Sequence, residues 1–134
     1  MLTTPVLLIT FNRPDHTRRV LTEILKQEPQ SLYIFQDGPR EGNEADALHC
    51  AEVRQVLEEL LPLQGVGGLY YSSTNLGCGP GPAAAISWFF SEVEQGIIIE
   101  DDAVPHPDFF PYCEQLLDKY KDNTNICAIG SMNV

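Results

Sequence analysis

The sequence predicts an α/β fold with three layers, in which helices cover both faces of a mainly parallel sheet. Apolar runs of strand length alternate with longer segments whose apolar residues recur at helical spacing. Such alternation is typical of parallel sheets. Polar clusters directly follow several apolar runs, and the carboxyl ends of parallel strands meet at one edge of a sheet. The chain has the length of one domain, residues 1–134.

The first strand is predicted over residues 5–11, because this continuous apolar run suits burial on both faces of a sheet. Asn12 and Arg13 break the run. The next helix is expected to begin at Pro14 or Asp15, since proline is well placed in a first helical turn. Apolar residues at positions 20, 21, 24 and 25 share one face of that helix.

The middle of the chain repeats the strand and helix pattern. A second strand is predicted over residues 31–36 and ends at Asp37-Gly38-Pro39, a turn sequence. A helix is expected to begin at Asn43 or Glu44 and to end before a proline at position 62. The third strand is predicted over residues 68–73.

The last part of the chain continues the same order after a glycine-rich loop at residues 75–82. A helix with alanines and aromatic residues is predicted over 83–93, and a fourth strand over 96–99. The remaining elements are a helix over 107–121 and a fifth strand over 126–129. The complete order is therefore β-α-β-α-β-α-β-α-β, with Rossmann-like connections.

The charge balance limits the classes of partner. Nineteen Asp and Glu residues face eight Lys and Arg residues, which gives a formal net charge of −11. Such a chain is not expected to bind nucleic acid or anionic lipid unaided, because its charge repels their phosphates. No apolar run approaches the ~20 residues of a membrane span, and no secretory signal opens the sequence. A cytoplasmic location is expected, or one at the membrane face of the cytoplasm.

Three adjacent carboxylates, Glu100, Asp101 and Asp102, follow the fourth predicted strand. Their charges repel one another, and partial burial raises the cost. A hard divalent cation would relieve the repulsion, and carboxylate oxygens suit Mg²⁺ or Mn²⁺. The alternatives are a solvated acidic loop or carboxylates that cap the next helix.

Two further polar side chains follow buried strands. Arg13 could grip a diphosphate with its planar guanidinium, or it could be a surface arginine near a helix start. Asp37 could accept a hydrogen bond from a base N–H or a ribose hydroxyl, or it could simply form a turn. Because both follow strands of one sheet, they are expected at the same edge as the acidic triplet.

The glycine-rich loop allows a different interpretation. Gly79-x-Gly81-x-x-Ala84 matches a dinucleotide fingerprint loosely. That fingerprint needs its first glycine almost directly after a strand, whereas Gly79 lies well past the third predicted strand. A loop of close backbone approach, with proline near the helix start, is favoured over a nicotinamide or flavin site.

Taken together, these motifs resemble glycosyltransferase family 2 and the GT-A superfamily. Residues 5–14 resemble the first strand and turn of that fold, and Phe35-Gln36-Asp37-Gly38 resembles the strand whose terminal Asp contacts the base. Asn75-Leu76-Gly77 resembles an Asn-x-Gly loop. Residues 97–102 resemble the strand that leads into the "DxD" metal motif, here in the Glu-Asp-Asp form that is also found in animal N-acetylglucosaminyltransferases acting on mannose.

The resemblance implies a donor site made of these residues: Arg13, Asp37, Asn75, Glu100 and Asp101, with Asp102 as the metal ligand. Asp37 would bind uracil or another base, and Arg13 would touch the diphosphate. Glu100 and Asp101 would contact sugar and ribose. The implied activity is inverting transfer of a sugar from a nucleotide-sugar, with a UDP-sugar expected, to an acceptor saccharide or lipid-linked glycan. Mn²⁺ or Mg²⁺ would be the cofactor.

Two departures from the family qualify this expectation. Pro80 and Pro82 stand where members usually carry a basic residue, and members are usually much longer than 134 residues. The sequence thus corresponds to the donor-binding half, and it supplies no residue that can be named as the general base. The alternative function is a non-catalytic nucleotide-binding or dimerising module, in which a homodimer covers the open sheet edge. A sugar-nucleotidyltransferase is disfavoured, because the first turn lacks glycine.

Overall fold

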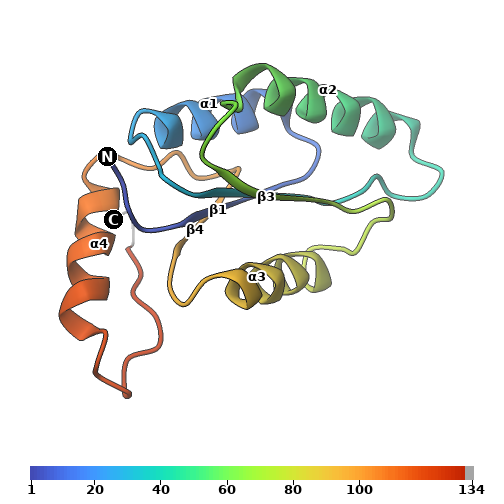
Figure 1. Ribbon diagram of the computed structural model, residues 1–134. Helices are drawn as coiled ribbons and strands as arrows, with labels where there is room; N and C mark the ends of the chain where they lie inside the picture. Colours follow the sequence, from blue (N-terminus) through green and yellow to red (C-terminus); the bar gives the residue numbers. More distant parts are fainter. Residues whose placement is uncertain (132–134) are drawn as a thin grey trace.

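The computed structural model describes residues 1–131 and contains four strands and four helices (Figure 1). In chain order they are β1 (Val6–Thr10), α1 (Pro14–Leu25), β2 (Leu32–Gln36), α2 (Glu44–Leu60), β3 (Val66–Tyr71), α3 (Pro80–Glu92), β4 (Ile97–Glu100) and α4 (Phe109–Tyr120). This order confirms the predicted α/β class, with connections of the Rossmann-like kind.

The four strands form one all-parallel sheet in the order β3-β2-β1-β4. The chain passes outward from β1 through β2 to β3 and then returns to the other side of β1. The order therefore reverses between β1 and β4. At such a switch point the loops after the two strands diverge, and a crevice forms at their carboxyl ends.

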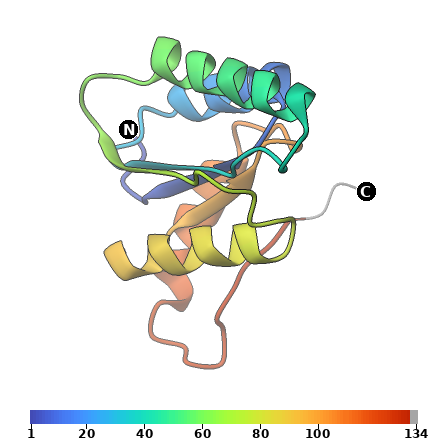
Figure 2. The same ribbon diagram turned by 90° about the vertical axis from the view of Figure 1, so that its right-hand side faces the viewer.

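The sheet is buried between helices on both faces, as Figure 2 shows. Val6 and Leu8 of β1 belong to one core cluster with residues of α1 and α2, whereas Leu7 and Ile9 belong to a second cluster with Ala85 and Phe89 of α3. Alternate residues of a strand point to opposite faces, so a continuous apolar run is what a doubly covered strand requires.

Helix α4 packs at the β4 side of the first core cluster. Phe110 and Cys113 are buried there. One carboxylate oxygen of Glu114 accepts hydrogen bonds from the backbone N–H and the hydroxyl of both Thr3 and Thr4, at 2.8–3.0 Å. Burial by itself would raise the pKa of Glu114, but these bonds outweigh it and hold the pKa below its ordinary value. They join the start of the chain to α4.

Three of the predicted elements begin two or three residues away from their observed starts. Helix α3 begins at Pro80 instead of residue 83, because a first helical turn tolerates proline, whose missing N–H would have no partner there. Strand β3 covers Val66–Tyr71 instead of 68–73, and α4 begins at Phe109 instead of 107. No helix within residues 1–131 is both long and apolar enough to cross a membrane.

The predicted fifth strand at residues 126–129 is wrong. The segment is irregular and mostly exposed, and the backbone N–H of Ile126 donates to Asn123 O in a local turn. In the described part of the chain β4 pairs with β1 alone. An apolar run becomes a strand only where a neighbouring strand supplies ladder hydrogen bonds, and this segment does not lie against β4.

Candidate functional site

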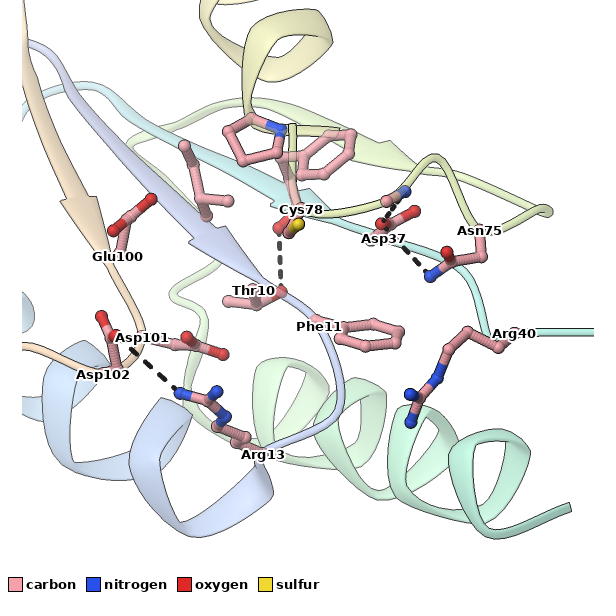
Figure 3. Close-up of a pocket in the computed structure, with 14 residues that line it drawn as sticks. Thr10, Phe11, Arg13, Asp37, Arg40, Asn75, Cys78, Glu100, Asp101 and Asp102 are labelled. Carbon is pink, nitrogen blue, oxygen red and sulfur yellow. Dashed lines mark hydrogen bonds and ion pairs between the residues drawn. The ribbon is translucent and has the colours of Figure 1, made fainter. Parts of the chain in front are cut away.

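A cavity of about 430 Å³ opens at the carboxyl ends of the strands. It lies at the switch point between β1 and β4 and extends to the loop before α3. The structure brings together in its lining all of the predicted site residues: Arg13, Asp37, Asn75, Glu100, Asp101 and Asp102. Figure 3 shows Arg13 and the acidic residues at one end, and Asp37, Asn75 and Arg40 at the other.

The acidic end of the cavity holds a carboxylate with an unsatisfied oxygen. Glu100 ends β4, and the backbone N–H of Asp101 donates to Ile9 O at 3.1 Å, which extends the ladder by one residue. Asp101 Oδ2 is buried and has no hydrogen-bond partner among the described residues. Burial raises the pKa of Asp101, against the attraction of Arg13. A buried carboxylate oxygen without a hydrogen-bond partner costs stability.

We predict that Asp101→Asn stabilises the metal-free protein at pH 7. Because the pKa of Asp101 is raised in the folded state, ionisation of its carboxyl group lowers the free energy of unfolding. The full loss applies above the folded-state pKa, and no loss applies below the unfolded-state pKa of about 3.9. Asparagine removes the charge, so the unfolding midpoint should rise by on the order of 3 °C at pH 7. Thermal unfolding in EDTA measures this, and the gain should vanish near pH 3. A midpoint that falls at pH 7 would contradict the prediction.

Arg13 and Asp102 form a loose ion pair across the same end of the cavity. Arg13 Nη1 lies 3.9 Å from Asp102 Oδ2, and the side chains are 51% and 56% exposed. Such an exposed pair contributes little to stability, about 0–1 kcal/mol. Arg13 could therefore bind an anion, and Asp102 a cation, at small cost to the stability of the fold.

The described residues 1–131 contain no ready-made cage of three or more His, Cys, Asp or Glu side chains for a metal ion. Mg²⁺ needs only one or two protein carboxylates when phosphate oxygens and water complete its octahedral shell. Asp102, which lines the cavity and is 56% exposed, is a carboxylate available for that kind of site.

Asp37 organises the opposite end of the cavity. Its Oδ1 accepts the backbone N–H groups of Gly38 and Leu76, both at 2.8 Å, and its Oδ2 accepts that of Gly77 at 3.1 Å. Gly77 has a positive φ of 93°, a conformation that glycine adopts without strain. Asp37 thus ties the end of β2 to the loop before α3 (Figure 3).

A second group of charged residues braces the turn after β1. The side chain of Asp46, at the start of α2, is only 3% exposed and accepts bonds from Arg40 Nε at 2.5 Å and Nη2 at 2.9 Å. It also accepts a hydrogen bond from Asn12 Nδ2 at 2.8 Å. These bonds, those from Arg40 above all, hold the pKa of Asp46 well below its ordinary value. The Arg40 guanidinium lies 6.0 Å from the centre of the Phe11 ring.

Sequence reasoning missed Phe11 and Arg40, which also line the cavity. The apolar run placed Phe11 at the end of the first predicted strand, whereas β1 ends at Thr10 and Phe11 belongs to the turn that follows. Arg40 could have been found, because it is one of only eight Lys and Arg residues and follows the Asp37 turn. Its buried partner Asp46 gives no such signal, because acidic residues are common in any first helical turn.

Gln36, the last residue of β2, is a buried polar group that supports the same turn. Its Nε2 donates to Cys50 O at 2.8 Å and to Phe11 O at 3.3 Å, and its Oε1 accepts Arg54 Nη2 at 3.1 Å. Helix α2, β2 and the Phe11 turn are thereby connected through one side chain. This wall of the cavity is consequently built before any ligand binds.

The chain matches no known protein-family model and no curated protein. A functional conclusion therefore depends on the chemistry of the cavity itself.

Proposed function

We propose that the cavity binds a nucleoside diphosphate sugar and that the chain serves in metal-dependent sugar transfer, as its resemblance to GT-A glycosyltransferases implies. One observation carries the proposal. Loops after β1, β2, β3 and β4 contribute to a single cavity that has carboxylates and an arginine at one end and hydrogen-bonding groups at the other. A nucleotide-sugar has the complementary layout, with a polar base at one end and a charged diphosphate towards the other.

The proposed roles follow from the groups available. Asp102 would hold Mn²⁺ or Mg²⁺, which neutralises charge on the leaving diphosphate. Arg13 would release Asp102 and donate to diphosphate oxygens in bidentate fashion. Glu100 and Asp101 would accept hydrogen bonds from sugar and ribose hydroxyls. Phe11 offers an aromatic face to the base.

The charge of the whole chain supports a role for the cation. At a net charge of −11, the protein repels a free diphosphate. Arg40 is largely neutralised by Asp46, which leaves Arg13 as the cation beside the acidic end of the cavity. A divalent metal would supply the positive charge that an anionic donor needs.

The proposal is tested by calorimetric titration of UDP, and of GDP, with Mn²⁺ and in EDTA. We expect UDP to bind with Mn²⁺ and to bind much more weakly in EDTA. Hydrolysis of UDP-sugars by the same protein tests transfer chemistry separately. Absence of binding by either nucleotide under both conditions would refute a nucleotide site.

The alternative of a non-catalytic assembly module draws support from the edge of β4, which pairs with no second strand within residues 1–131. An open edge offers unpaired N–H and C=O groups to another chain. That function predicts a homodimer in sedimentation equilibrium and no nucleotide affinity. A monomer that binds UDP would refute it.

A further inference from the structure

The carboxylate of Asp37 has no acceptor position to spare. A carboxylate has about four lone-pair sites. Three of them take the backbone N–H groups described above, and Asn75 Nδ2 approaches Oδ2 at 3.4 Å as the fourth donor. Residue Asp37 is only 7% exposed. A ligand N–H would have to displace one of these donors to reach it.

Helix α3 closes the remaining approach to Asp37. A Cβ atom at Gly81 would stand 3.1 Å from Asp37 Oδ2, so the glycine backbone packs directly against this oxygen. The carboxylate is thus enclosed between the loop at residues 75–77 and the first turn of α3. Its hydrogen bonds hold that loop in place.

Asn75, by contrast, presents a free acceptor at the cavity. Its Nδ2 donates to Gly38 O at 2.9 Å and, at a longer distance of 3.4 Å, to Asp37 Oδ2. Two acceptors on this side require the nitrogen there, so the orientation of the amide is determined by its partners. Among residues 1–131 no donor reaches Asn75 Oδ1, and Asn75 lines the cavity (Figure 3).

We infer that Asn75 Oδ1, and not the carboxylate of Asp37, accepts the ring N–H of the bound nucleobase. Asp37 is a positioning residue that acts through Asn75. This inference rests on the proposed function, because it assigns the base contact within the nucleotide site. Asn75 Oδ1 can accept the N3–H of uracil. It favours uracil over cytosine, because N3 of cytosine is itself an acceptor.

The experiment compares UDP with N3-methyl-UDP by calorimetry in Mn²⁺, on the wild type, Asn75→Ala and Asn75→Ser. The methyl group removes the N3–H donor and crowds whichever side chain faces it. The wild type should bind UDP roughly tenfold more tightly, the effect of one hydrogen bond of about 1.4 kcal/mol. Both variants lack the amide oxygen, so they should bind UDP and N3-methyl-UDP with about equal affinity.

The possible results separate the hypotheses. Variants that bind UDP and keep the tenfold preference would show that another acceptor, with Asp37 the nearest, faces N3, and would overturn the inference. Equal binding of both ligands by the wild type would overturn it as well. A wild type that binds neither ligand would refute the nucleotide site itself, and with it this assignment. Thermal unfolding verifies that each variant is folded. If Asn75→Ala does not fold, Asn75→Ser serves for the comparison of the two ligands.

Discussion

Replacing Asp102 by alanine is expected to abolish Mn²⁺-dependent binding of UDP while the protein stays folded. The side chain is 56% exposed and, among residues 1–131, its one ion pair is the 3.9 Å contact with Arg13, so the fold depends little on it. Loss of an outer-shell partner of a bound metal typically costs 10- to 100-fold in affinity, and loss of the direct ligand should cost more than about 100-fold. Calorimetry with UDP and Mn²⁺ measures the change, and circular dichroism measures the fold.

Asp108→Ala is the matched control for this experiment. Asp108 is an acidic residue of the same connection between β4 and α4, its side chain is 90% exposed, and it does not line the cavity. Both variants remove one negative charge, so a general electrostatic effect would appear in both. If Asp102→Ala binds UDP with unchanged metal dependence, Asp102 is not the metal ligand.

The second large effect is expected at Gly38, where alanine should lower the free energy of unfolding by about 3 kcal/mol. A Cβ atom there would lie 2.7 Å from the carbonyl carbon and oxygen of Thr74 and 2.8 Å from Ser72 O. These are backbone atoms, which cannot rotate away as a flexible side chain could. The loops after β2 and β3 would be forced apart, and with them Asp37 and Asn75. Thermal unfolding should show a midpoint lower by about 10 °C.

Gly79→Ala provides the comparison, because an added Cβ at Gly79 meets no atom of residues 1–131 within 4 Å apart from its own chain neighbours and helix backbone. Its φ of −98° and ψ of −63° also suit alanine. This variant should unfold within about 0.5 kcal/mol of the wild type. Equal stabilities for the two variants would mean that the close approach at Gly38 is relieved without cost.

The class of fold and the edge at which the site lies were determined by the sequence alone. Strand runs such as residues 6–10 and the helical spacing in α1 are local patterns, set by burial on one or both faces. Parallel strands bring their carboxyl ends to one edge, so polar residues after strands converge whatever the strand order is. That rule sufficed to place Arg13, Asp37 and the acidic triplet at one cavity.

Only the tertiary structure decided which atoms of that cavity are free. The partners of Asp37 lie up to 40 residues away, and Asp46 binds Asn12 across 34 residues, so no local pattern contains these pairs. The same holds for residues 126–129, whose apolar character suggested a strand but whose ladder partner could come only from a distant segment. Apolar burial follows from composition and period, whereas a hydrogen bond requires two particular groups to meet. The sequence therefore determined the layers and the edge of the sheet at which the cavity lies, and the assembled fold decided that the carboxylate of Asp37 is occupied while no donor of residues 1–131 reaches Asn75 Oδ1.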